Sequence, residues 1–454
     1  MKTNLSAEDT AEIAHCIEWG LPLPPKFAAH FASSKDVEPR VEHDFNPQLH
    51  LPDASMGALF VGDNLDVLGW LKRTNQQPRP KLIYIDPPFD VGSDFHIPIE
   101  LDSGHKIQHV AYSDAWGEGQ KSFLHMLAPR LKAMVDWLDE TGSIVVHCDY
   151  RTVAQIRLLL DRFLGPDRFR NEIIWHYTGG GRAKRYFSRK HDSLLWYSKS
   201  DTYTFNLDAV RVPYKATSGF ARSGIVAKSG KHYQPHPKGT PVDDVWDIPI
   251  INPMAKERLG YPTQKPAALL ERIILALSQE GDCVADFFCG SGTTLAVAAQ
   301  NGRRWIGSDQ SPMAISTTLQ RLQDAGLTLF EHTNALSRPK LHIDIQAQLH
   351  KKTDTWMLKG LRCHVQSIPG LDQDQYKLED GRLCDQTGTV LMTHPGEWIR
   401  SWFLVGAQSH QCLAKGTGFP SEVPVSLSKE PSFRLILIDI MGGIHACPVA
   451  VSDV

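Results

Sequence analysis

Two short motifs in this 454-residue sequence combine acids with turn residues in a way that suits chemistry on a bound ligand. The first is Asp86-Pro87-Pro88-Phe89, which follows the apolar run 81–85. Because proline fixes φ and has no amide hydrogen, this turn leaves carbonyl oxygens free to accept hydrogen bonds from a ligand. With the Asp86 carboxylate and the Phe89 ring beside them, these acceptors suit a planar group that carries an exocyclic NH2. The alternative is a strand that ends in a Pro-Pro turn and keeps Phe89 in the core.

The second motif is a glycine turn, Asp286-Phe287-Phe288-Cys289-Gly290-Ser291-Gly292-Thr293-Thr294. Glycines let a ligand approach the backbone closely, and free amides at a helix start favour a negative group. Asp309 follows at the end of the next apolar run, where a carboxylate can accept both hydroxyls of a ribose. The pattern resembles the dinucleotide fingerprint Gly-x-Gly-x-x-Gly. Leu295 stands at the third glycine position, which disfavours a dehydrogenase.

These motifs must be positioned by regular elements, and from residue 58 onward apolar runs of strand length alternate with stretches of helical period. The expected strands are Ala58–Gly62, Lys81–Asp86, Ser143–Asp149, Asn171–Tyr177, Asp192–Ser198, Asp282–Phe288 and Arg303–Ser308. The expected helices are Leu65–Arg73, Lys121–Leu138, Val153–Leu164, Pro266–Ser278, Thr293–Gln300 and Pro312–Gln323. Strands separated by helices predict an α/β fold with a doubly wound, mostly parallel sheet. Working residues in such sheets lie at the carboxyl ends of strands.

Charge is distributed unevenly along the chain. The whole sequence has 48 Lys and Arg against 51 Asp and Glu, but residues 168–240 hold 14 basic and four acidic residues. This basic window interleaves cations with aromatic rings and glycines, a mixture that suits phosphate contacts and base stacking. The cations expected to contact nucleic acid are Arg182, Lys184, Arg185, Arg189 and Lys190. The alternative is a solvated basic loop without a specific role.

Several classes of protein are disfavoured by composition. The eight cysteines include no Cys-x-x-Cys pair, so neither a disulfide framework nor a metal site is expected. No apolar run approaches the roughly 18 residues of a membrane span, and residues 1–20 are acidic where a secretory signal would be basic and apolar. A cytoplasmic protein is expected. No phosphate-binding Gly-x-x-x-x-Gly-Lys-Ser/Thr motif or nuclease motif is present.

Taken together in their order, the motifs resemble those of the DNA amino-methyltransferases of the permuted (beta) N4/N6 class. The similarity is closest to the modification subunits of type III restriction systems and their stand-alone relatives. It covers about residues 57–325 and rests on Gly62-Asp63-Asn64-Leu65-Asp66-Val67-Leu68, Tyr84-Ile85-Asp86-Pro87-Pro88-Phe89, Thr141–His147, Asn171–Trp175, Tyr261-Pro262-Thr263-Gln264-Lys265-Pro266 and the glycine turn. Phe89 stands where tyrosine is commoner, and Phe287 where many relatives have proline.

The resemblance implies a Rossmann-like domain that uses S-adenosylmethionine. The glycine turn would wrap the methionine end of the cofactor, Asp309 would hold the ribose, and Asp63 would lie near the adenine or the amino acid moiety. The full set of implied cofactor residues is Asp63, Thr263, Lys265, Asp286, Phe287, Gly290, Gly292, Thr293 and Asp309. The implied catalytic residues are Asp86, Pro87, Pro88 and Phe89, with Asp86 and the Pro87 carbonyl accepting the two N–H bonds of an amine on a flipped base.

An aspartate before Pro-Pro resembles the adenine-N6 enzymes, so N6 of adenine in double-stranded DNA is the expected target. The alternatives are a cytosine-N4 methyltransferase, a non-catalytic DNA-specificity subunit, and an enzyme that acts on RNA or protein. A homodimer and a restriction subunit are further partners that the resemblance implies. The expected organisation is an N-terminal extension (1–48), a methyltransferase domain (49–330) with a target-recognition insertion (168–260), and a β-rich C-terminal domain (335–454). Four strands are expected after residue 335, at Leu361–Ile368, Gly388–Thr393, Ile399–Gly406 and Phe433–Asp439.

Overall fold

The computed structural model describes most of the chain between Gly57 and Ser452. The residues that it leaves undescribed are 1–56, 75–77, 90–91, 93, 101–105, 115–119, 180, 216, 323–326, 332–341, 353–354, 368–375, 380–381, 386–389, 393–398, 407–411, 418–421, 426–431, 440–443 and 453–454. The expected N-terminal extension over 1–48 therefore lies outside the described residues.

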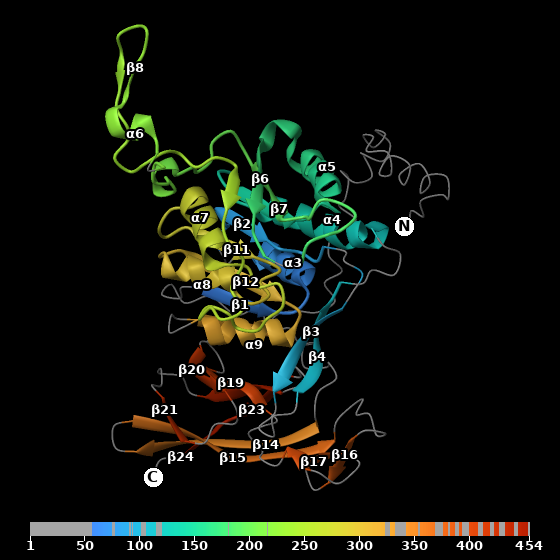
Figure 1. The fold of residues 1–454 in the computed structure, drawn as a ribbon. Helices are drawn as coiled ribbons and strands as arrows, with labels where there is room; N and C mark the ends of the chain where they lie inside the picture. The colour runs from blue at the N-terminus through green and yellow to red at the C-terminus, as the bar shows by residue number, and fades with distance from the viewer. Residues whose placement is uncertain are drawn as a thin grey trace, which may run out of the picture.

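A nine-stranded sheet forms the centre of the fold (Figure 1). Its strands stand in the order β10, β6, β7, β5, β2, β11, β12, β1, β13. Neighbours are parallel, except that β7 runs antiparallel to both β5 and β6. The expected mostly parallel sheet is thus confirmed. The bounds are β1 (Gly57–Val61), β2 (Leu82–Ile85), β5 (Ser143–Cys148), β6 (Phe169–His176), β7 (His191–Ser198), β10 (Val245–Asp247), β11 (Cys283–Asp286), β12 (Arg304–Asp309) and β13 (Leu327–Glu331).

Helices cover both faces of this sheet, so the fold is doubly wound (Figure 1). Side chains of β1 alternate between two buried cores, with Leu59 and Val61 on one side and Ala58 and Phe60 on the other. This alternation follows from the pleat of a strand, and burial on both faces explains why the strands are continuous apolar runs. The first core holds α7 (Ala267–Leu277), α8 (Thr293–Gln300) and α9 (Pro312–Arg321), and the second holds α3 (Asn64–Thr74), α4 (Gln120–Trp137) and α5 (Val153–Leu164).

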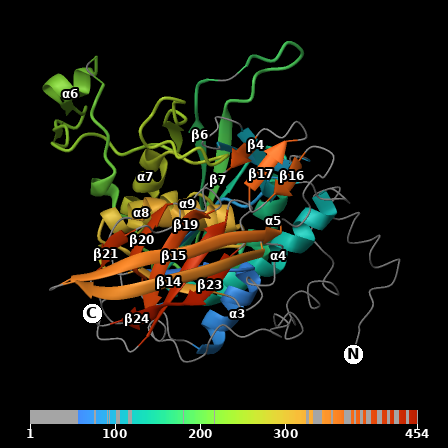
Figure 2. The same cartoon turned by 90° about the horizontal axis from the view of Figure 1, so that it is seen from below.

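Smaller sheets lie outside the central one. The strands of the C-terminal segment gather at the end of the molecule next to α9, and Figure 2 shows β14 and β15 crossing in front when the molecule is seen from below. They enclose a buried cluster of their own that includes Leu349, Trp402 and Leu435. The remaining elements are β3 (Asp94–Glu100), β4 (Lys106–Ser113), α6 (Gly219–Ser223), β8 (Ile225–Val226), β9 (His232–Tyr233), β14 (His342–Lys352), β15 (Thr355–Ser367), β16 (Tyr376–Glu379), β17 (Arg382–Asp385), β18 (Val390–Met392), β19 (Ile399–Gly406), β20 (Cys412–Thr417), β21 (Glu422–Val425), β22 (Phe433–Asp439), β23 (Ile444–Pro448) and β24 (Ala450–Ser452).

Each strand and helix expected for the α/β region is present, with ends that differ by at most two residues. The agreement is poorer at the C-terminal end, where the strand expected to start at Leu361 begins at Thr355. The division into domains stays a prediction. None of the described helices is long and apolar enough to cross a membrane.

Candidate active site

A pocket opens where the carboxyl ends of β2, β11, β12 and β1 meet. These ends meet because the four strands are parallel neighbours. The structure brings together in this lining all four residues expected to be catalytic and all but one of those expected to bind the cofactor. Gly292 does not line the pocket. The expected residues that do are Asp63, Asp86, Pro87, Pro88, Phe89, Thr263, Lys265, Asp286, Phe287, Gly290, Thr293 and Asp309.

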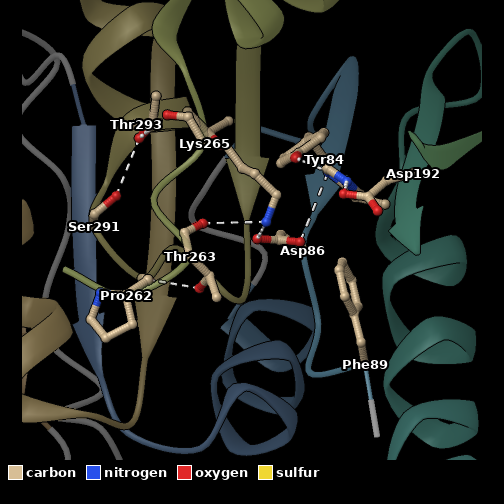
Figure 3. A network of polar contacts seen from close by, with 12 residues as sticks. Tyr84, Asp86, Phe89, Asp192, Pro262, Thr263, Lys265, Ser291 and Thr293 are labelled. Atoms are coloured by element: carbon tan, nitrogen blue, oxygen red, sulfur yellow. Dashed lines mark hydrogen bonds and ion pairs between the residues drawn. The ribbon is translucent and has the colours of Figure 1, made fainter. Parts of the chain in front are cut away.

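Asp86 follows β2 directly, and its carboxylate is held from one side only. The ammonium of Lys265 forms an ion pair with Asp86 Oδ2 (Figure 3). The other oxygen, Oδ1, is buried and has no hydrogen-bond partner among the described residues. The turn that follows is fixed by the amide of Phe89, which donates to Asp114 Oδ2 at 3.0 Å. One carboxylate oxygen is therefore anchored, whereas the other keeps an unused capacity to accept a hydrogen bond.

Phe89 lies beside Asp86 rather than within the hydrophobic core. Its side chain is partly exposed and lines the pocket. Figure 3 shows its ring standing below the Asp86 carboxylate. The ring centroid is 5.6 Å from that of His147, and the Lys265 ammonium is 5.4 Å from it. A flat face next to the free carboxylate oxygen is the arrangement that a planar amine-bearing ligand requires.

His147, at the end of β5, connects Asp86 to a second carboxylate. The imidazole is fully buried. Its Nδ1 lies 2.8 Å from the Tyr84 hydroxyl and 3.8 Å from Asp86 Oδ1, and its Nε2 lies 3.3 Å from Asp192 Oδ2. Sequence patterns alone give no catalytic role to His147 or Asp192. Their contact depends on the antiparallel pairing of β7 with β5, which places the first residues of β7 beside the last residues of β5.

The glycine turn is held by the two acids that flank it. Asp286 accepts from Thr294 Oγ1 at 2.6 Å and from the amide of Phe288 at 3.0 Å, and Asp309 accepts from the amide of Gly290 at 2.9 Å. Gly290 has φ of +49°, in the left-handed region where glycine is favoured. The turn thus presents its backbone to the pocket in a fixed conformation.

Gly292 is needed for packing. Its φ is +71°, and a Cβ atom at this position would lie 2.6 Å from Thr318 Oγ1 on α9. Because Gly292 does not line the pocket, its lack of a side chain serves the close approach of α8 and α9 rather than contact with a ligand.

Burial raises the pKa of Asp286 to about 7. The hydrogen bonds from Thr294 and Phe288 lower the pKa, but they do not offset the loss of solvent, and the nearby carboxylates of Asp86 and Asp309 raise it further. A carboxyl group in this environment binds a proton near neutral pH. A cation placed in the pocket would favour the charged form.

Asp63 directly precedes α3 and also lines the pocket. Its Oδ1 accepts from the amide of Leu65 at 2.8 Å, as an N-terminal cap does, and its Oδ2 pairs with Arg130 at 2.5 Å. Asn64 donates to the carbonyl of Phe287 at 2.7 Å. These bonds tie the start of α3 to the glycine turn.

The segment before α7 closes the pocket on the side of Lys265. Thr263 has φ of +58°, an uncommon value for a residue with a branched side chain. Its carbonyl accepts from Lys265 Nζ at 3.3 Å, and the carbonyl of Lys265 accepts from Thr293 Oγ1 at 3.3 Å. Thr263 and Lys265 therefore shape the pocket wall and orient Asp86.

The cations expected to contact DNA lie between β6 and β7. Arg182, Lys184 and Arg185 have exposed side chains, and the neighbouring Phe187 is 98% exposed. An aromatic ring that stands in solvent beside three cations is consistent with a nucleic-acid surface.

The other two cations of this loop contact other protein groups, and the expectation that they contact DNA stays a prediction. The Arg189 guanidinium lies between two aromatic rings, 3.9 Å from the centroid of Tyr150 and 4.7 Å from that of Tyr186. The Lys190 ammonium donates to two carbonyls of the same loop. Arg189 and Lys190 thus fix the shape of the loop.

No group of three or more metal-ligating side chains occurs among the described residues.

The family model and the similar sequences agree on one family. Residues 81–320 match the family model described as DNA methylase. The type II methyltransferase M1.MboII of Moraxella bovis is 35% identical over 204 residues, which cover 43% of this chain and 77% of that protein. The DNA adenine methyltransferase YhdJ of Escherichia coli K12 is 32% identical over 246 residues, covering 54% and 76%. A crystal structure of the M1.HpyAVI–SAM complex aligns with a TM-score of 0.38 and 19% identity over 59% of this chain and 100% of that one.

Proposed function

This chain belongs to the DNA methylase family, and from that premise we propose that it transfers a methyl group from S-adenosylmethionine to N6 of adenine in double-stranded DNA. The observation that carries the proposal is the free oxygen of Asp86, which is buried at the pocket floor beside the Phe89 ring. An acceptor and a stacking surface are what an exocyclic amine on a planar base requires.

The charge of the pocket fits the cofactor. S-adenosylmethionine supplies an electrophilic methyl group on a positively charged sulfonium. Carboxylates outnumber cations in the pocket lining, so a positively charged ligand would be favoured there. Asp309 would accept the ribose hydroxyls, and the backbone of the glycine turn would hold the methionine end. The carboxylates are Asp63, Asp86, Asp114, Asp286 and Asp309, and the cations are Arg130 and Lys265.

The chain's own groups act on the amine of the base. Its nitrogen is a poor nucleophile because the lone pair is delocalised into the ring. Asp86 Oδ1 and the Pro87 carbonyl would each accept one N–H bond, which draws the nitrogen towards a tetrahedral geometry and localises the lone pair. Positioning and electrostatic stabilisation then supply most of the rate, without a covalent enzyme intermediate.

The base must leave the duplex to reach this pocket, because a paired base cannot enter it. Phe89 would stack on the flipped base. Arg182, Lys184 and Arg185 would contact phosphates nearby, while Arg189 and Lys190 keep their loop in shape. A specificity subunit without activity would not need the Asp86 oxygen to be free and buried.

Adenine is favoured over cytosine as the target. The residue before Pro87 is an aspartate, as in the adenine-N6 enzymes that this chain resembles, and YhdJ is named a DNA adenine methyltransferase. We place the enzyme in the cytoplasm, in a restriction-modification system or as a stand-alone modification enzyme. A homodimer and a restriction subunit stay predictions.

The proposal is tested by sequencing the methylated bases of a host that expresses the gene and of the same host without it. N6-methyladenine is expected at one short recognition sequence in the expressing strain only. N4-methylcytosine at such a sequence would move the assignment to the cytosine class, and no new modified base would contradict the proposal.

A further inference from the structure

His147 lies between two carboxylates in the interior of the active site. Its Nδ1 faces Asp86 Oδ1 at 3.8 Å, and its Nε2 faces Asp192 Oδ2 at 3.3 Å. The ring is fully buried, and Trp175 packs against it edge-on with ring centroids 5.5 Å apart. A buried imidazole that is flanked by two acids can carry a proton as well as occupy space.

The hydrogen bonds define which nitrogen carries the hydrogen. Burial acts to raise the pKa of Asp192, but the hydrogen bond from His147, the charge of Lys265 and the hydrogen bond from Tyr177 hold it below its usual value. Asp192 is therefore an acceptor, and His147 Nε2 carries the hydrogen that it receives. Burial and the neighbouring carboxylates raise the pKa of Tyr84 well above its usual value, so its hydroxyl keeps a hydrogen to donate to Nδ1.

This tautomer explains why Asp86 Oδ1 has no partner. With its hydrogen on Nε2, the imidazole presents a lone pair at Nδ1 and has no hydrogen to give to Asp86. Oδ1 is left to accept an N–H from the substrate. Lys265 occupies the other oxygen and stabilises the charged carboxylate, so a proton that reaches Asp86 needs an onward acceptor. Figure 3 shows Lys265, Asp86, Tyr84 and Asp192 following one another from left to right.

We propose that His147 is that acceptor: the proton released by the methylated amine passes through Asp86 Oδ1 to His147 Nδ1. This inference rests on the proposed methyl transfer. The amine nitrogen forms a bond to the methyl carbon as the bond between that carbon and sulfur breaks. The nitrogen then loses one proton and keeps the electron pair of its N–H bond.

The proton binds Asp86 Oδ1 and moves to His147 Nδ1, while the Tyr84 hydroxyl turns its hydrogen away. For this transfer, the distance between Asp86 Oδ1 and His147 Nδ1 must shorten by about 1 Å from its value of 3.8 Å. The imidazolium then lies between two carboxylates, and its proton returns to solvent as the product leaves. His147 does not contact the substrate in this proposal but acts through Asp86, so it is a positioning residue. The groups that surround it are Tyr84 from β2, Asp86 after β2, Asp192 from β7, Tyr177 after β6, Lys265 before α7 and, beyond Tyr84, Asp286 from β11.

The test compares single-turnover methyl transfer by the full chain with saturating S-adenosylmethionine and DNA, measured across pH. The variant is His147→Gln, whose amide can keep both hydrogen bonds but cannot accept a proton. His191→Gln, an exposed histidine at the start of β7, is the matched control. We expect the rate of the wild type and of the control to rise with pH and then level off, as for a group that must be unprotonated to act. We expect His147→Gln to be about a hundredfold slower and to lack this rise, with unchanged affinity for both substrates.

A second variant covers the case in which His147→Gln fails to fold. Asp192→Asn removes the charge that stabilises the imidazolium, so the rise in rate should move to lower pH and the maximal rate should fall. A wild-type profile in either folded variant would overturn the role of His147. An inactive wild type would instead contradict the proposed methyl transfer, so the two failures are distinguishable.

Discussion

Lys265 and Asp86 form an ion pair across the pocket floor, although 179 positions separate them in the sequence. Both side chains are largely buried, with 11% and 18% of their surfaces exposed. The pair joins the segment that enters α7 to the turn that leaves β2. Because the ammonium binds Oδ2, we propose Oδ1 as the oxygen that accepts from the substrate.

Replacement of Lys265 by methionine should therefore slow catalysis more than it weakens cofactor binding. We expect the rate of methyl transfer to fall about a hundredfold, since Asp86 is no longer oriented by the ammonium. The affinity for S-adenosylmethionine should be retained, because the pocket becomes more negative. Single-turnover rates and calorimetric binding measure the two effects, with Lys256→Met, at an exposed position, as the control. A large loss of cofactor affinity with an unchanged rate would show that Lys265 binds the cofactor directly.

Cofactor binding should depend on pH through Asp286. Burial raises the pKa of this group to about 7 in the free protein, and a sulfonium cation favours the charged carboxylate. Below pH 7, binding of S-adenosylmethionine must therefore displace a proton from Asp286. The affinity should be constant at high pH and should fall by up to about tenfold for each pH unit below 7.

Calorimetry across pH measures this dependence for the wild type and for Asp286→Asn. S-adenosylhomocysteine lacks the sulfonium charge and is the matched ligand, with a weaker pH dependence expected. Identical profiles for the wild type and Asp286→Asn would contradict the role of this carboxyl group.

The exposed cations of the basic loop should determine the salt dependence of DNA binding. Replacing Arg182, Lys184 and Arg185 by glutamine should weaken binding, and the slope of log K against log salt should decrease by about 0.9 for each phosphate that is no longer neutralised. The control replaces Lys72 and Arg73, at the end of α3, and Arg79, which precedes β2. These residues lie towards the amino ends of the strands, away from the pocket. If both triple variants show the same slope, the loop is a solvated surface.

Gly292 should be required for stability. Gly292→Ala adds a Cβ atom 2.6 Å from Thr318 at a φ of +71°, and we expect a loss of about 2 kcal/mol or more in the free energy of unfolding. Gly281→Ala is the control, because its φ is +84° and no atom lies within 4 Å of the added Cβ. Urea unfolding measures both. Equal losses would show that backbone strain alone accounts for the effect.

Three acids of the pocket could be predicted from the sequence because each one follows an apolar run, whereas Asp114, which accepts from the amide of Phe89, was not predicted. Asp86, Asp286 and Asp309 end strands that are buried on both faces, and parallel strands end at one edge. Other strands were not predicted, among them β10 and β13 at the two edges of the central sheet, β3, β4, β14 and the start of β15. A strand of three residues such as β10 is too short to show a period.

The contact of His147 with Asp192 could not be predicted from local pattern. It depends on β7 running antiparallel beside β5, in the register that pairs His147 with Leu194 and Cys148 with Ser193. The two residues are 45 positions apart, and a helix and a strand lie between them in the sequence. No short sequence motif therefore includes both residues. The role of Gly292 in packing likewise depends on the position of Thr318 on α9.

The identity of the methylated base tests the central claim most directly. The protein is incubated with S-adenosylmethionine labelled in its methyl group and with unmethylated duplex DNA, and the DNA is then digested to nucleosides. We expect label in N6-methyladenine alone, and none with Asp86→Asn, which should still bind DNA. Label in N4-methylcytosine, or equal labelling by Asp86→Asn, would contradict the account.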